Sequence, residues 1–275
     1  MKIDIDAVIR ERLPRYYRYI PRPLIAWLEH EVCQRDLNSL LGHAEGLEGA
    51  DFCRDVLAYL HVDYAVHGAD SLPAAADRRV TYVSNHPLGG LDGMALIDMV
   101  TRHHGVEPYF VVNDLLMAVE PLRKVFVPVN KLGRQSRGAT TMVEEAFASE
   151  RPMIVFPAGL VSRRGKGGKV ADLRWRKSFV NLSVSSGRDI VPLYFDGENS
   201  RLFYRLAQAR ERLGLKFNYE MLRLPREVML SRGKHFDIYV GRRIPVTRLH
   251  GGARAVDESL AIRKIVYSLK LGPAE

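Results

Sequence analysis

The chain has 275 residues, of which 47% are apolar and 27% charged, a balance typical of a globular protein with a sizeable core. This composition excludes a disulfide-stapled miniprotein, a collagen and an intrinsically disordered chain. No apolar run approaches the ~20 residues that cross a bilayer, and the first residues lack the apolar core of a secretory signal. We therefore expect a folded, cytoplasmic protein.

Positive charge is concentrated in the middle of the chain. The whole sequence carries a formal net charge of +9, with 41 Lys and Arg against 32 Asp and Glu. Residues 121–188 contain 14 basic and 4 acidic residues, so this window accounts for the excess. Such concentration favours an anionic ligand or surface. No helix-turn-helix, zinc knuckle or aromatic RNA-binding signature is present, so we expect no nucleic-acid partner.

Helical patterns occupy residues 1–60, which we expect to form an N-terminal extension in front of a domain at 61–275. Within the extension, residues 10–28 interleave tyrosines, leucines and a tryptophan with arginines, and three prolines interrupt them. Such a segment either packs on the protein or lies in the headgroup layer of an anionic membrane, where arginines and aromatic rings are favourable. We expect it to associate peripherally with the inner face of the membrane.

From residue 62, short β-rich runs alternate with helical stretches. Strands are expected at 62–67, 79–84, 108–112, 124–129, 153–156, 189–195 and 235–240. Helical periodicity occupies 94–101, 139–149, 173–185, 200–213 and 254–270, and Asp172 is the expected N-cap of the third of these helices. This alternation predicts an α/β fold with functional loops at the strand ends.

One loop after a predicted strand carries candidate catalytic groups. It contains His86 and Asp92, and Gly89 and Gly90 allow it to fold back sharply. Asp92 can then accept the imidazole N–H, which leaves the other ring nitrogen as a base. In the alternative reading, Asp92 only caps the following helix and His86 is an ordinary loop histidine. The remaining histidines and the two cysteines lack metal-ligand spacing, so we expect no metal site.

Four segments in order resemble the conserved blocks of the glycerolipid and lysophospholipid acyltransferases, most closely the hemolysin-like branch. They are Asn85–Asp92, Phe126–Lys131, Phe156–Arg164 and Ile190–Tyr194, and the resemblance covers roughly residues 62–245. It implies a mixed central sheet flanked by helices, as in glycerol-3-phosphate acyltransferase-like folds. It also implies an enzyme that moves an acyl chain from a thioester, on coenzyme A or acyl carrier protein, to a hydroxyl of a glycerolipid or lysolipid, without a further cofactor.

The resemblance also implies roles for individual residues. His86 would be the base, Asp92 would orient it, and the second and third blocks would bind the acceptor. The residues expected to bind substrate are Asn85, Lys131, Arg134, Gly159, Ser162, Arg163 and Arg164.

Several positions depart from the family pattern. Five residues separate His86 from Asp92 where four are usual, and Lys131 stands where an arginine is usual. In the third block, Ala158, Leu160 and Val161 replace a glutamate, a threonine and an arginine. A phosphate dianion would lack its usual bidentate partner there. We therefore expect an acceptor other than glycerol-3-phosphate or lysophosphatidate, such as a lyso-amino-acid lipid or another hydroxylated lysolipid.

Two functions of other classes compete with acyl transfer. The chain is alternatively a non-catalytic basic module that docks on a membrane, or a hydrolase in which water replaces the acceptor. Incubation with an acyl thioester, with and without a lysolipid, distinguishes all three.

Overall fold

The computed structural model describes residues 2–129, 137–215 and 217–271. Among these residues, seven strands form one sheet in the order β1-β9-β8-β2-β5-β3-β4. They are β1 (Asp63–His67), β2 (Val80–Ser84), β3 (Tyr109–Asn113), β4 (Phe126–Val129), β5 (Met153–Val155), β8 (Asp189–Asp196) and β9 (His235–Val240). Each of the seven predicted strands is confirmed, with bounds that differ by at most two residues at either end.

The sheet is mixed, as expected. β8, β2, β5, β3 and β4 run parallel, whereas β9 is antiparallel to β8 and β1 follows the direction of β9. Because the carboxyl ends of parallel strands meet at one edge, the loops after β2, β5 and β8 converge there. This convergence brings together segments that lie far apart in the sequence.

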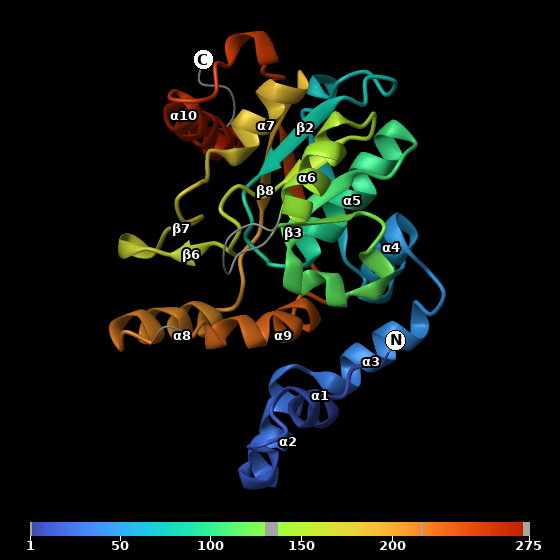
Figure 1. Ribbon diagram of the computed structural model, residues 1–275, viewed down its shortest axis with the longest axis vertical. Helices are drawn as coiled ribbons and strands as arrows, with labels where there is room; N and C mark the ends of the chain where they lie inside the picture. The colour runs from blue at the N-terminus through green and yellow to red at the C-terminus, as the bar shows by residue number, and fades with distance from the viewer. Residues whose placement is uncertain (1, 130–136, 216, 272–275) are drawn as a thin grey trace.

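Helices cover both faces of the sheet, as Figure 1 shows. The α-helices of the described residues are α1 (Ile5–Arg12), α2 (Arg22–Glu31), α3 (Gln34–His43), α4 (Gly49–Tyr59), α5 (Leu91–His104), α6 (Arg137–Ala148), α7 (Ser178–Ser186), α8 (Arg201–Arg212), α9 (Leu224–Met229) and α10 (Ala255–Ser268). α4 and α5 pack on one face, and α6, α7 and α10 pack on the other.

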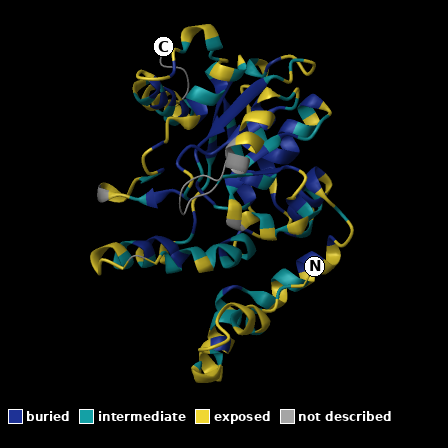
Figure 2. Cartoon of the chain, in the orientation of Figure 1, coloured by how far each residue is buried: buried dark blue, intermediate teal, exposed yellow. Residues whose placement is uncertain are grey.

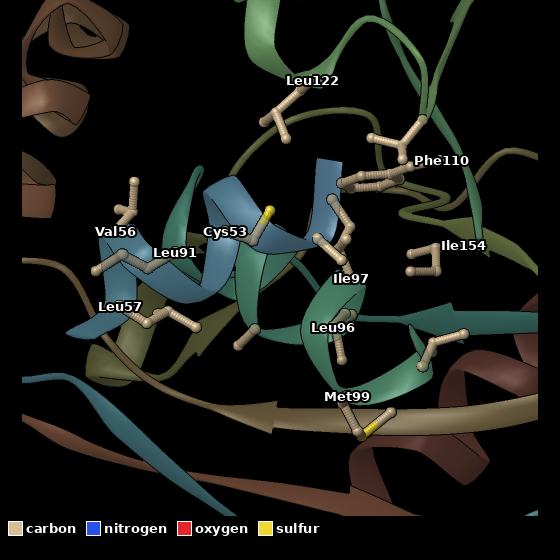
Figure 3. Close-up of a cluster of buried hydrophobic side chains, with 14 of the residues drawn as sticks. Cys53, Val56, Leu57, Leu91, Leu96, Ile97, Met99, Phe110, Leu122 and Ile154 are labelled. Atoms are coloured by element: carbon tan, nitrogen blue, oxygen red, sulfur yellow. The ribbon is translucent and has the colours of Figure 1, made fainter. Parts of the chain in front are cut away.

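Successive side chains of β2 point to opposite faces of the sheet and enter two different apolar clusters. Tyr82 points into the cluster that contains α4 and α5, and Val83 points into the cluster that contains α6, α7 and α10. Figure 3 shows part of the first cluster, in which Cys53 and Val56 of α4 are buried together with Leu91 and Ile97 of α5. All five residues of β2 are buried, including the polar Thr81 and Ser84, as expected of a central strand that is covered on both faces.

The core begins earlier than the expected domain boundary at residue 60. Leu40 and Leu41 of α3 and Phe52 and Val56 of α4 are buried in the same cluster as the sheet. α4 therefore covers one sheet face although it precedes residue 61, and the division into an extension and a domain stays a prediction. Only the segment before α3 behaves as an extension: α1 has no buried residue and α2 has one, Ile25.

The extension is nevertheless attached to the rest of the chain. Figure 1 shows α1 and α2 projecting beyond the sheet, and Figure 2 shows how much of their surface is exposed. Glu31 at the end of α2 forms an ion pair with Arg223, and Arg226 donates a hydrogen bond to the carbonyl oxygen of His30 over 2.6 Å. These contacts join α2 to α9 and the turn before it. Among the described residues, no helix has the length and apolar character that spanning a bilayer requires.

Two regions differ from the sequence prediction. The helix expected from residue 173 begins only at Ser178, because the carboxylate of Asp172 binds other groups instead of capping it. The basic loop before it is a short hairpin of β6 (Arg163–Arg164) and β7 (Val170–Ala171). Two-residue strands are too short to leave a periodic pattern.

Candidate active site

The loop between β2 and α5 holds the predicted dyad. The Nδ1 of His86 lies 2.9 Å from Oδ2 of Asp92. Asp92 is fully buried, and the His86 side chain is 17% exposed, so one ring edge remains accessible. The extra residue between them is accommodated by Gly89, whose φ of +83° is in the left-handed region that favours glycine.

Asp92 binds the loop as well as the imidazole. Its Oδ2 accepts hydrogen bonds from the backbone N–H groups of Leu88 and Gly89, and its Oδ1 accepts from those of Gly90 and Gly93. Burial alone would raise the pKa of Asp92. The charge of His86 and the bonds from His86, Leu88 and Gly93 outweigh burial, so the pKa lies below its usual value. Asp92 is the second residue of α5, whose N-cap is Gly90, so it is not merely a helix cap.

An ionised Asp92 fixes the tautomer of His86. A carboxylate only accepts hydrogen bonds, so Nδ1 must donate, and Nε2 of the neutral ring keeps its lone pair. The ring also stacks on Phe156, which follows β5, with centroids 4.1 Å apart and planes 21° apart. Phe110 of β3 packs edge-to-face against Phe156. An imidazole held in this way accepts a proton from a hydroxyl, which suits a base-assisted group transfer.

The third block contacts His86 twice: Phe156 stacks on the ring, and Ser162 binds the backbone. The N–H of Ser162 donates to the carbonyl oxygen of His86 over 2.8 Å, and the Ser162 hydroxyl is buried. Gly159 lies at the start of this segment with a φ of +61° and is exposed. Ala158 and Val161, two of the departures from the family pattern, are buried in apolar clusters.

Asp172 is a residue of the site that sequence reasoning missed. Its Oδ1 accepts hydrogen bonds from the His86 N–H over 3.1 Å and from the Ser162 hydroxyl over 2.6 Å, and its Oδ2 accepts from Trp175 Nε1 over 2.8 Å. A signal was present in the sequence. Between Glu150 and Asp189, Asp172 is the only acidic residue in a strongly basic stretch.

Asn85 links the loop to the neighbouring strand β8. Its Nδ2 donates to the carbonyl oxygen of Phe195 over 2.9 Å, and its Oδ1 accepts from the Phe195 N–H over 2.7 Å. The side chain is buried and its amide is used on both sides. Its expected contact with substrate stays a prediction.

The two arginines of the third block are engaged within the fold. Arg163 is 8% exposed, lies 2.9 Å from Glu220 and packs over the ring of Phe203. Arg164 lies 3.2 Å from Glu198 and packs over the ring of Tyr204. Both charges therefore have protein counterions, because α8 and the turn after it fold against the β6–β7 hairpin. Lys131 and Arg134, also expected to bind substrate, lie outside the described residues.

A different set of basic residues is exposed beside the site. We call the segment from Lys169 to Lys177 the basic strap. It runs from the hairpin to α7 and contains Asp172. Its exposed cations are Lys169, Arg174, Arg176 and Lys177. None of them takes part in an ion pair found among the described residues.

Comparison with known proteins identifies the family of the chain. A family model described as acyltransferase matches residues 7–272. Two proteins named lyso-glycine lipid O-acyltransferase, from Phocaeicola vulgatus and Bacteroides thetaiotaomicron, are each 39% identical over 267 residues. These alignments cover 97% of this chain and 95% and 97% of the two relatives, respectively. The crystal structure of the 1-acyl-sn-glycerophosphate (LPA) acyltransferase PlsC from Thermotoga maritima aligns with 98% of this chain and 92% of that chain, at 14% identity and a TM-score of 0.48.

A mixed α/β fold with a histidine held by a buried carboxylate suits a group-transfer enzyme. The chain belongs to the lipid acyltransferase family, as the four sequence blocks suggested, and it is an acyltransferase.

Proposed function

We propose that the protein transfers a fatty acyl chain from a thioester to the hydroxyl of a lyso-amino-acid lipid, with His86 as the base. The carrying observation is the 2.9 Å contact between His86 Nδ1 and the buried Asp92 carboxylate. The acceptor oxygen attacks the thioester carbonyl carbon while its proton passes to Nε2 of His86. The C–S bond then breaks, and the leaving sulfur takes up the proton from His86.

No covalent acyl-enzyme is part of this proposal. Ser162 is buried and its hydroxyl donates to Asp172, and Cys53 is buried among apolar side chains of α4 and α5. Neither offers a nucleophile to a substrate at the exposed edge of His86. Direct attack by the acceptor therefore fits these side chains better than a two-step mechanism.

The acceptor assignment rests on the third block and on the relatives. Ala158 and Val161 are buried among apolar side chains, and Arg163 and Arg164 are paired with acids. This segment supplies no free guanidinium for a phosphate dianion. The two relatives at 39% identity are named for a lyso-glycine lipid, whose headgroup name specifies an amino acid. Both observations favour an amino-acid headgroup.

The acyl donor is coenzyme A or acyl carrier protein in this proposal. Either carrier is anionic, and the exposed cations of the basic strap lie within a few residues of Asp172, which contacts His86. Replacing Arg174 and Arg176 with glutamate should raise the KM for the donor several-fold and leave the KM for the lysolipid unchanged. An unchanged donor KM would place the carrier elsewhere.

The acceptor is a lipid, and we propose that the protein meets it as a cytoplasmic enzyme on the inner face of the membrane. Tyr16, Tyr19 and Trp27 of the extension are exposed by 66%, 67% and 53%, beside Arg15 and Arg18. Aromatic rings and arginines on one short segment are typical of contact with anionic headgroups.

Purified protein, an acyl thioester and a panel of lysolipids test the function. We expect acylated lyso-amino-acid lipid as the preferred product and at least a ~100-fold loss of turnover in His86→Ala with the fold retained. Free fatty acid released equally with and without acceptor would instead indicate a hydrolase. If no thioester is cleaved at all, the remaining alternative is a non-catalytic module that docks on a membrane. The highest kcat/KM on lysophosphatidate or glycerol-3-phosphate would contradict the acceptor assignment.

A further inference from the structure

The site contains a second buried carboxylate that does not touch the imidazole. Asp172 is 6% exposed and lies 86 residues after His86 in the chain. Its Oδ1 accepts from the backbone N–H of His86, while the N–H of Ser162 donates to the backbone carbonyl of the same histidine. The Ser162 hydroxyl donates to the same Oδ1, so the three residues form a closed cycle of hydrogen bonds. The peptide groups on both sides of the His86 side chain are thus held by one cluster.

The Asp172 carboxylate is itself held in a fixed orientation. Trp175 Nε1 donates to its Oδ2 over 2.8 Å. Its backbone is bound by α10, since its N–H donates to the Tyr267 hydroxyl over 2.7 Å and Arg263 donates to its carbonyl oxygen over 2.9 Å. Burial raises the pKa of Asp172 above its usual value, and the bonds from Ser162, His86 and Trp175 offset only part of that rise. All three carboxylate contacts are made by donors, which is the environment an ionised carboxylate requires.

We infer that Asp172 is a positioning residue of the acyl-transfer site. It sets the backbone of His86 so that the ring reaches both Asp92 and the face of Phe156. This inference rests on the proposed role of His86 as base. A base displaced by about 1 Å loses on the order of 100-fold in rate, so a residue that fixes its backbone acts on turnover, not on substrate affinity.

The first test removes the carboxylate. In Asp172→Leu, the kcat per folded molecule should fall by at least ~30-fold, and the KM for the acceptor should change by less than ~3-fold. The matched control is Asp98→Asn. Asp98 is another buried carboxylate; it lies on α5 away from the loop and binds Tyr64, Arg54 and Arg102. This control should lose stability but keep the kcat of the folded fraction.

A second test does not depend on the leucine variant folding. An asparagine at position 172 can still accept from His86 and Ser162 with its oxygen, but its NH2 then faces Trp175 Nε1, so two donors oppose each other. We expect Asp172→Asn to lower kcat about 10-fold. Adding Trp175→Phe removes the opposing donor, and the double variant Asp172→Asn/Trp175→Phe should recover at least half of that loss. A purely structural residue would show no such recovery in turnover per folded molecule.

The outcomes separate this inference from the proposed function. Full activity in His86→Ala would remove both. If His86→Ala is inactive while Asp172→Asn keeps wild-type kcat, only the role of Asp172 is wrong. A rise in KM at unchanged kcat would also overturn it, because Asp172 would then act in binding. A kcat that falls in Asp172→Asn and recovers in the double variant supports it.

Discussion

At the scale of single residues, the site combines two carboxylates with different tasks. Asp92 contacts the His86 ring and stays ionised because the charge of His86 and backbone donors outweigh its burial. Asp172 contacts the His86 backbone from another part of the chain. The Asp92 contact can be formed within one loop, whereas the Asp172 contact exists only after the sheet has assembled.

Replacing Asp92 with asparagine should reduce turnover by at least ~10-fold. The amide presents an NH2 as well as an oxygen, so it can stabilise the imidazole tautomer that carries its proton on Nε2 and has no base to offer. Steady-state kinetics on folded protein measures this, with Asp98→Asn as the matched buried carboxylate. Wild-type turnover in Asp92→Asn would mean that Asp92 only holds the loop.

His104 should make the free energy of unfolding depend on pH. It is buried beside Tyr82, whose hydroxyl lies 2.8 Å from Nε2, while Nδ1 lies 2.9 Å from the carbonyl oxygen of Ala75. Burial lowers the pKa of His104 below its usual value of 6.5, and the bond to Ala75 offsets only part of this. Below pH 6.5 the unfolded chain therefore binds the proton more strongly, and stability falls as the pH falls.

Chemical denaturation at pH 7.5 and 5.5 measures this effect. His104→Gln cannot take up the proton, so it should lose less stability between these two pH values than the wild type does. An identical pH dependence in both proteins would show that His104 does not contribute.

At the scale of secondary-structure elements, a single arginine joins the ends of three of them. Arg188 is fully buried, and its guanidinium donates to the carbonyl oxygens of Phe147 and Ser149 at the end of α6, and to those of Val80 and Arg151 near the starts of β2 and β5. Arg79 lies nearby, binds Glu150 and the carbonyl oxygen of Ser186, and is only partly buried. Burial lowers the pKa of Arg188 to about 10, which still leaves it charged at neutral pH.

Arg188→Met should lower the free energy of unfolding by ~3 kcal/mol, because several buried carbonyl groups lose their donors. Arg79→Met, which removes a half-exposed contact with Glu150 and Ser186, should cost less than ~1 kcal/mol. Urea titrations of both variants give the comparison. Equal losses would mean that the carbonyl groups near Arg188 find water or other donors.

At the scale of the whole molecule, the extension and the sheet edge with the site belong to one arrangement. α9 and the turn before it contact α2 on one side, through Arg223 and Glu31, and the His86 loop on the other. A Cβ added to Gly89 would lie 2.9 Å from a methyl group of Leu224. α9 and the turn before it thus lie between the end of α2 and the loop that carries the base.

Vesicle binding tests whether the extension contacts the membrane. The protein should sediment with phosphatidylglycerol vesicles at low ionic strength and be released by salt, which screens contacts between exposed charges. Arg15→Glu/Arg18→Glu should weaken this binding at least ~10-fold. The control, Arg78→Glu/Arg242→Glu, reverses two exposed charges before β2 and after β9 and should bind as the wild type does. Equal weakening by both pairs would mean that only the net charge matters.

The sequence by itself determined the seven strands, the α/β class, the His86 and Asp92 pair and the family. These features are local. A short run rich in β-branched and aromatic residues identifies a strand, and His86 and Asp92, 6 residues apart on one glycine-containing loop, meet without help from a distant segment. The family blocks are local as well, since each is a few consecutive residues.

Only the tertiary structure decided what the long-range partners do. Asp172 fits the sequence pattern of a helix cap, yet its carboxylate binds His86 and Ser162, because β7 and the third block meet at the sheet edge. The sequence predicted that Arg163 and Arg164 would be available to bind substrate. In the structure, α8 and the turn after it place Phe203 and Glu220 beside Arg163. Such pairings depend on which segments the sheet order brings together, and no pattern within a short window contains that information.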